Sequence, residues 1–221
     1  MSNDTFIREV NEEIRQERAK ALWTRFGPVA IALAVLVVLG TAAWVAYEHF
    51  ANQRANASGD RFSQALTLAN TNKPDEALAA FKALEEDGYG NYPVLARLRS
   101  ATVLAQKADF AGAVAAFDAV AADTAVPQVL QDAARLRAAL LLVDHGSYAD
   151  VASRAEALST DDNPFRHSAR EALGLSAWKE NRAADALKLF DQIKDDQQAP
   201  NGARQRATMM GDLIRSSGSA S

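Results

Sequence analysis

Cysteine is absent from this chain of 221 residues, and proline occurs only six times. Without cysteine the chain has no disulfide and no thiolate ligand for a metal ion, and an oxidising compartment is permitted without being indicated. Runs of β-branched residues are also scarce outside one apolar block. The formal net charge of −4 does not indicate a nucleic-acid surface, so no nucleic-acid partner is expected. This composition favours helix throughout, in one or two domains.

The apolar block is GPVAIALAVLVVLGTAAWVAY, which covers residues 27–47 without a charge. Its 21 residues match the roughly 20 that a helix needs to cross a lipid bilayer. Trp23 and Phe26 precede it, and Trp44 and Tyr47 lie at its far end. Aromatic side chains at such places anchor a span at the two membrane interfaces. The block therefore predicts a transmembrane helix over 27–47.

A cleaved signal peptide is the competing interpretation, because Thr41-Ala42-Ala43 resembles a small-residue cleavage site. However, the apolar stretch of a signal peptide is usually about 7–15 residues long, and this one is longer. A charged segment of 26 residues also precedes it. A buried core helix is rarely so uniformly apolar. We therefore expect a retained anchor that crosses the bilayer once.

Basic residues indicate the orientation of this span. Only Arg54 and Arg61 lie within about twenty residues after it, whereas five basic residues lie before it. The positive-inside rule then places the N-terminus in the cytoplasm. In a bacterium this means an inner-membrane protein whose C-terminal part is periplasmic. The five basic residues before the span are Arg8, Arg15, Arg18, Lys20 and Arg25.

Residues 1–26 form the predicted cytoplasmic segment. Ile7, Val10 and Ile14 make a narrow apolar stripe at helical spacing, which predicts a short amphipathic helix. The alternative is a solvated, partly frayed segment, because acidic and basic residues are equally numerous here.

Beyond the span, one helical pattern occurs four times. KPDEALAAFKALEED, FAGAVAAFDAVAAD and AADALKLFDQIKDD show it most clearly. Its reference position, called the aligned alanine position, recurs at intervals of 36, 38 and 35 residues. Such a period is typical of an α-solenoid built from stacked helix hairpins. The position is occupied by Ala77, Ala113, Val151 and Ala186, and the position four residues later by Phe81, Phe117, Ala155 and Phe190.

An earlier helix precedes each of these. Twelve residues before the aligned alanine position the residue is always small: Ala65, Ala101, Ala139 and Gly174. Five residues before it, where the hairpin must turn, lie Asn72, Ala108, Gly146 and Asn181. Asn and Gly tolerate the left-handed conformation that ends a helix, and Ala108 is the exception in this set. This pattern of small residue, turn, alanine and aromatic resembles the tetratricopeptide repeat, although its usual early tryptophan and final proline are missing.

The expected fold is therefore all-α. A single N-terminal transmembrane helix is followed by a right-handed α-solenoid of about four tetratricopeptide-like hairpins over residues 48–215. The segment GARQRATMMGDLI echoes the first helices LARLRSATVLA and AARLRAALLLV, so a fifth first helix should cap the stack. Residues 216–221 are expected to be a disordered tail.

An arginine and an aspartate also recur in each repeat. The arginine lies sixteen residues before the aligned alanine position, and the aspartate lies ten residues after it. In an antiparallel hairpin these places face each other, so the sequence predicts the ion pairs Arg61–Asp87, Arg97–Asp123, Arg135–Asp161 and Arg170–Asp196. The alternative is that the aspartates cap or turn the chain locally and the arginine stems cover apolar neighbours. Arg204 has no equivalent aspartate, and Asp196 is the nearest acid in the alignment.

Catalytic chemistry is not indicated. His49, His145 and His167 are far apart in the aligned scheme and have no metal-ligand spacing with carboxylates. GLSAW at Gly174–Trp178 lacks the closing glycine of a nucleophile elbow and lies within a helix. We therefore expect no enzyme, no cofactor and no metal site.

A surface for a protein partner is the better prediction. In tetratricopeptide arrays the first helices line a groove, and the corresponding positions here are unusually apolar, which suits a peptide or protein ligand. The alternative is that several of these leucines, and Trp178, are buried between hairpins. The predicted groove residues are Phe62, Leu66, Asn70, Leu98, Thr102, Gln106, Leu136, Leu140, Asp144, Glu171, Leu175 and Trp178.

A short charged segment beginning FIREVNEE, one span and about four such hairpins together resemble a bacterial family, the ancillary subunit of the Sec translocon. The resemblance implies binding to Sec translocon subunits and to a membrane-anchored periplasmic chaperone of the prolyl-isomerase type, with a role in assisting newly exported proteins. It assigns no residue-level site. The alternative is a tetratricopeptide scaffold of another envelope or cell-division complex.

Overall fold

The computed structural model describes residues 3–218, and this part of the chain is helical with no strand. It divides into two compact units, residues 1–56 and residues 57–221. Helix α1, Asn3–Asn70, runs through both units. The predicted stripe of Ile7, Val10 and Ile14 concerns side chains outside the described ones, and residues 219–221 of the predicted tail also lie outside the description.

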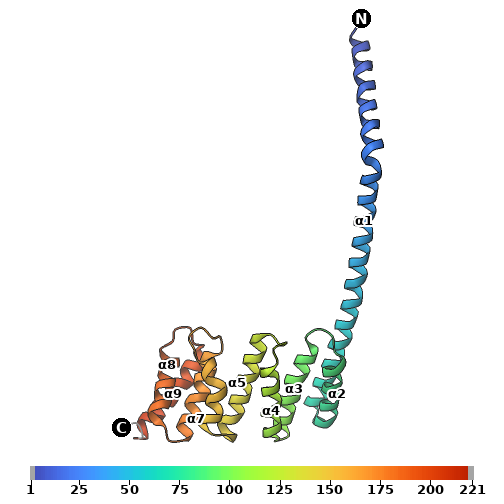
Figure 1. Ribbon diagram of the computed structural model, residues 1–221. Helices are drawn as coiled ribbons and strands as arrows, with labels where there is room; N and C mark the ends of the chain where they lie inside the picture. The colour runs from blue at the N-terminus through green and yellow to red at the C-terminus, as the bar shows by residue number, and fades with distance from the viewer. Residues whose placement is uncertain (1–2, 219–221) are drawn as a thin grey trace. The chain divides into compact units, whose positions relative to one another are not determined.

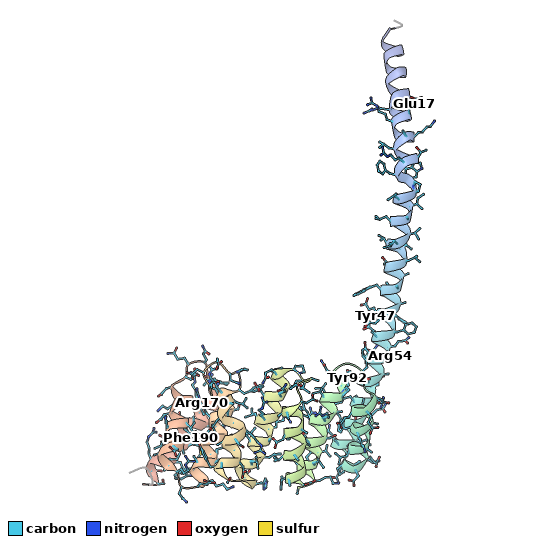
Figure 2. The ribbon with its side chains drawn as sticks, viewed as in Figure 1. Glu17, Tyr47, Arg54, Tyr92, Arg170 and Phe190 are labelled. Carbon is cyan, nitrogen blue, oxygen red and sulfur yellow. The ribbon has the colours of Figure 1, made fainter. Side chains whose placement is uncertain are left out.

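The first unit consists of helix α1 up to residue 56. Its apolar stretch is long enough to cross a membrane, and none of its most apolar window is buried. A signal sequence near an N-terminus has the same properties. Leu36, Trp44 and Tyr47 each expose about two thirds of their surface or more, so their apolar surface finds no cover within the unit. Tyr47, labelled in Figure 2, projects away from the helix. Such surface is suited to lipid.

The second unit is a row of helix hairpins followed by one last helix (Figure 1). Each first helix packs against the second helix that follows it, as the repeat predicts. The first helices are residues 57–70 of α1, α3 (Tyr92–Gln106), α5 (Gln128–His145) and α7 (Arg166–Lys179). The second helices are α2 (Pro74–Asp87), α4 (Phe110–Ala122), α6 (Tyr148–Ala155) with the 3-10 turn η1 (Glu156–Leu158), and α8 (Ala183–Asp195). Helix α9 (Asn201–Ser216) closes the row. The all-α fold predicted from the repeat is confirmed.

The predicted hairpin turns use the left-handed conformation in three of the four cases. Asn72, Ala108 and Asn181 have φ of 59°, 62° and 62°. Gly146 differs from the expectation, because its φ of −133° is in the extended region. Here Ser147 starts helix α6 with a capping box that it forms with Asp150, so the chain leaves α5 extended and no left-handed residue is needed.

The small and aromatic positions of the repeat meet in the hairpin cores. Phe81, Phe117 and Phe190 expose at most 2% of their surface, and Ala65 and Ala101 none. In the fourth hairpin the two positions approach so closely that a Cβ on Gly174 would lie 3.0 Å from Cζ of Phe190. Buried side chains form a separate cluster for each stretch of the row, as expected when each hairpin contacts only its neighbours.

Candidate functional site

Two of the predicted arginine–aspartate pairs are present. Arg61 Nη2 lies 2.7 Å from Asp87 Oδ1, and Arg97 Nη1 lies 2.6 Å from Asp123 Oδ2. Arg97 also donates to the carbonyl oxygen of Ala119 at 3.1 Å, which ties the start of α3 to the end of α4. The pair at Arg61 is the more exposed, so solvent screens it more strongly.

The other two predicted pairs are wrong. Arg135 binds Asp132 on its own helix, at 2.7 Å, and the carbonyl oxygen of Ala121. Asp161 instead contacts Arg170 of the next hairpin, which also donates to the carbonyl oxygen of Ser159. The reason is the short second helix of the third hairpin. Helix α6 ends at Ala155 and continues as a 3-10 turn, so Asp161 lies in the following loop.

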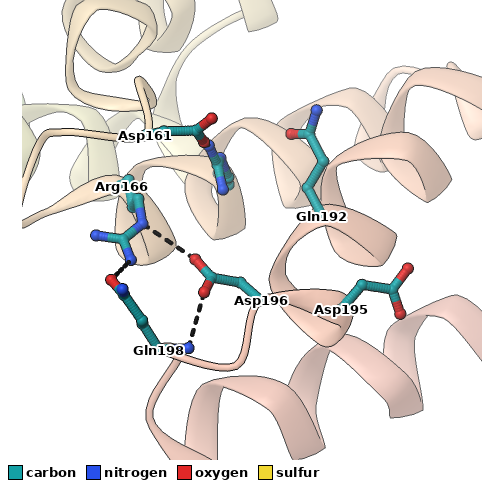
Figure 3. Close-up of a pocket in the computed structure, with 7 residues that line it drawn as sticks. Asp161, Arg166, Gln192, Asp195, Asp196 and Gln198 are labelled. Atoms are coloured by element: carbon teal, nitrogen blue, oxygen red, sulfur yellow. Dashed lines mark hydrogen bonds and ion pairs between the residues drawn. The ribbon is translucent and has the colours of Figure 1, made fainter.

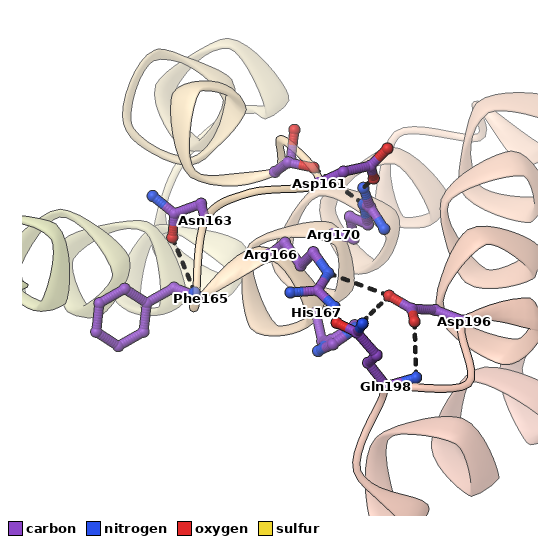
Figure 4. Close-up of polar contacts among 9 residues, drawn as sticks. Asp161, Asn163, Phe165, Arg166, His167, Arg170, Asp196 and Gln198 are labelled. Atoms are coloured by element: carbon purple, nitrogen blue, oxygen red, sulfur yellow. Dashed lines mark hydrogen bonds and ion pairs between the residues drawn. The ribbon is translucent and has the colours of Figure 1, made fainter.

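Asp196 is therefore free for other partners, and Figure 4 shows them around its carboxylate. His167 Nε2 lies 2.7 Å from Oδ2, Arg166 Nε donates to the same oxygen at 3.1 Å, and the Gln198 N–H donates to Oδ1 at 2.8 Å. The hydrogen bond from His167, followed by that from Gln198, holds the pKa of Asp196 well below its usual value. Arg204 does not reach it and donates to Asn201.

A polar cavity of about 510 Å³ lies beside this cluster (Figure 3). Its charged side chains largely neutralise one another, because Arg166 binds Asp196 and Arg170 binds Asp161. The arrangement fastens the loop between α8 and α9 to helix α7, which is a structural role. The lining residues are Asp161, Arg166, Arg170, Gln192, Asp195, Asp196 and Gln198.

The predicted groove on the first helices is mostly closed by packing. Leu136 is 8% exposed and belongs to a core cluster. Asn70, Gln106, Asp144 and Leu140 are exposed, and Leu140 is the apolar member of this set, at 45%. The partly buried members that pack on the cores are Phe62, Leu66, Leu98, Leu175 and Trp178.

The two remaining groove residues, Thr102 and Glu171, are contacted by arginines that the groove prediction did not include. Arg137 Nη1 donates to Thr102 Oγ1 at 3.3 Å. Arg206 binds Glu171 through two contacts, of 2.5 and 2.7 Å. Both arginines lie two residues after the repeated arginine, and Arg99 occupies the same place in α3. The signal for this second register is visible in the strings RLRS, RLRA and RQRA.

Stacked helix hairpins of this kind define a class of scaffold that presents the surfaces of its helices to other proteins. No cluster of metal-ligating side chains is found among the residues described. The model of the tetratricopeptide repeat-like domain matches residues 20–174, and the chain belongs to this family. Domains of the family are typically non-catalytic interaction modules. No curated protein and no solved structure matches the chain.

Proposed function

We propose that this protein is a membrane-anchored interaction module at the Sec translocon. Through its repeats it binds translocon subunits and a periplasmic chaperone of the prolyl-isomerase type, and it assists newly exported proteins. The observation that carries the proposal is the combination, in one chain, of a lipid-suited helix with a tetratricopeptide repeat-like domain, whose match over residues 20–174 includes that helix. The sequence order of charged segment, span and repeats supports the translocon as the partner.

The proposed location is the bacterial inner membrane, with residues 27–47 as the span, residues 1–26 in the cytoplasm and residues 48–215 in the periplasm. The excess of arginine and lysine before the span supports this orientation. Exposed apolar side chains on α1 support the span itself.

Site-specific photo-crosslinking in native membranes tests the partner. A photoreactive amino acid replaces Leu140, which is exposed on α5, in the full chain, and crosslinked proteins are identified by mass spectrometry. Recovery of translocon subunits supports the proposal. Recovery of cell-wall or division proteins instead would favour a scaffold of another envelope complex. The matched control carries the photoreactive residue at Lys82, exposed on the second helix α2.

A further inference from the structure

We propose that the α3–α5 face binds a peptide segment that carries a carboxylate next to an apolar side chain. We use this name for the surface formed by Arg99, Thr102, Arg137 and Leu140. The inference rests on the proposed function in one respect, namely that the repeats bind a protein partner. It adds the chemistry of the ligand and the residues that receive it.

The structure contains an internal example of what an arginine in this register binds. In α9, Arg206 holds Glu171 of the preceding first helix, with Nε 2.5 Å from Oε1 and Nη2 2.7 Å from Oε2. Two parallel contacts of this kind are the strongest form of carboxylate recognition by a guanidinium. An arginine in this register is thus placed to receive a carboxylate from the direction of the neighbouring first helix.

The equivalent arginine in α5 has no such carboxylate. The residue of α3 that corresponds to Glu171 is Leu98, so Arg137 turns to the hydroxyl of Thr102 at 3.3 Å. Arg99 lies one turn before Thr102 on the same side of α3, and in the described part of the chain it has neither an ion pair nor a hydrogen bond. Two guanidinium groups therefore face solvent without a counter-charge.

Helices α3 and α5 offer no free acidic side chain close to Arg99 and Arg137 among the residues that the structure describes. Asp144 is seven residues beyond Arg137 on α5, about 10 Å along the helix axis. Asp132 of α5 is occupied by Arg135 and Gln128. The α3–α5 face is therefore locally cationic on a chain with a net charge of −4. Charge complementarity selects an acidic ligand.

Leu140 supplies the apolar half of the ligand chemistry. It lies three residues after Arg137, on the same side of α5, and exposes 45% of its surface. The other groove leucines, for example Leu136 and Leu98, are buried or partly buried against the cores. A ligand that covers Leu140 while it pairs with the arginines must place an apolar group beside a carboxylate, as an extended peptide does.

The test uses the full chain in phosphatidylcholine nanodiscs and a fluorescein-labelled peptide of alternating glutamate and leucine. Binding is measured by fluorescence anisotropy against a twin in which glutamine replaces glutamate. We expect the acidic peptide to bind at least about tenfold more tightly than its twin, since one charge-assisted contact is worth about 1.4 kcal/mol or more. Added salt should weaken the binding of the acidic peptide but not that of its glutamine twin.

The double variant Arg99→Gln, Arg137→Gln should lose the preference for the acidic peptide. Leu140→Gln should weaken the binding of both peptides. The matched control is Lys82→Gln with Lys188→Gln, which removes the same charge from exposed positions of α2 and α8. Arg99→Gln alone guards against misfolding, because it removes no internal contact. It should lower the affinity for the acidic peptide by several fold.

Equal binding of the two peptides, no binding of the acidic one, or an equal loss in the lysine control would overturn the inference. Arginine-dependent binding to phosphatidylglycerol vesicles without peptide preference would also overturn it, in favour of a lipid headgroup. The proposed function fails separately: translocon crosslinks that persist in the double arginine variant would support the function while they contradict the proposed site.

Discussion

At the scale of single residues, the repeated arginines show how strongly partner choice depends on local context. Arg61 and Arg97 bind the aspartate at the end of their own hairpin, whereas Arg135 binds within its helix. Arg170 reaches across a loop to Asp161. All of them occupy one register of the repeat, so the position determines where the stem points, and the surrounding carboxylates determine where the guanidinium binds.

Replacing Asp196 by Asn should destabilise the fold at neutral pH, because the carboxylate accepts bonds from His167, Arg166 and Gln198. The folded state lowers the pKa of Asp196, so its stabilisation is complete above the unfolded pKa of about 3.9 and is lost as pH falls through the lower folded pKa. The melting temperature of the variant should therefore lie below that of the wild type at pH 7, and the difference should shrink below about pH 4.

The measurement is thermal unfolding of the purified full chain, followed by far-ultraviolet circular dichroism across this pH range. Asp195→Asn is the control with the same charge change at an exposed neighbour whose Lys194 contact is 3.7 Å long. An equal effect of both substitutions would contradict a specific role for the Asp196 contacts.

Ala108→Gly should stabilise the fold by about 0.5–1 kcal/mol, because a left-handed alanine is strained and glycine is not. Ala108 has φ of 62° at the end of the second hairpin's first helix. Ala115→Gly is the matched control on an exposed position of α4, and there the same change should cost about 0.5–1 kcal/mol. In chemical denaturation, the midpoint should shift upward for Ala108→Gly and downward for Ala115→Gly, both relative to the wild type. A loss of stability in both would exclude strain at Ala108.

At the scale of helices, the third hairpin departs from its neighbours. Helix α6 is only 8 residues long and continues as a 3-10 turn, whereas α5 has 18 residues. The aromatic position of the repeat is here Ala155, and Leu158 fills the core from the 3-10 turn. This local change of geometry moves Asp161 out of reach of Arg135 and explains the pairing error.

Gly174→Val should destabilise the fourth hairpin by about 1–3 kcal/mol, the usual cost of overpacking a core. Any side chain at this position meets the ring of Phe190, because its Cβ would lie 3.0 Å from Cζ of that ring. Adding Phe190→Leu should recover part of the loss, since the shorter side chain makes room. Thermal unfolding of both single variants and the double variant measures the coupling, and strictly additive losses would contradict direct contact.

Leu98→Glu and Leu140→Glu should differ in their effect on the stability of the fold, although the two residues occupy neighbouring first helices. Leu98 packs on the core of the second hairpin, so a buried charge there should cost about 2 kcal/mol or more. Leu140 is 45% exposed, so Leu140→Glu should change the stability by no more than about 0.5 kcal/mol while it weakens binding of the acidic peptide. Circular dichroism melts check the first expectation. Unfolding of both variants would mean that Leu140 also belongs to the core.

At the scale of the whole molecule, the chain contains two units with opposite surface requirements. Between residues 29 and 50, the apolar residues of α1 whose side chains the structure describes are exposed, whereas the apolar residues of the repeats are largely enclosed in hairpin cores. The exposed surface of the first unit is suited to an apolar surrounding, whereas the second unit covers most of its apolar side chains by its own packing. This contrast is the physical basis of the proposed anchored module.

The absence of cysteine allows the orientation to be tested with single introduced thiols. In intact spheroplasts, Ser217→Cys should react with a membrane-impermeant thiol reagent, because the repeats are proposed to be periplasmic. Ser2→Cys should stay unlabelled until the membrane is permeabilised. Gel shifts of the labelled chain report both results, and the wild type is the blank. The reverse pattern would refute the periplasmic assignment.

The amino-acid sequence alone was sufficient to predict the apolar stretch of α1, the hairpin repeat and the left-handed turns at Asn72 and Asn181, and it located the turn at Ala108 only through the register of the repeat. These features depend on local periodicity and on backbone preferences that a few neighbouring residues specify. The family match over residues 20–174 agrees with this reading of the repeat.

Which arginine binds which aspartate, and which leucines stay exposed, depends on how the helices pack in three dimensions. Long charged side chains reach several ångströms, so a change of one helix end redirects them, as Asp161 and Asp196 show. Exposure of Leu140 beside buried Leu136 depends on the spacing of neighbouring helices, which periodicity within one helix does not contain. The unpaired state of Arg99 and the pairing of Arg206 with Glu171 follow from the same long-range packing.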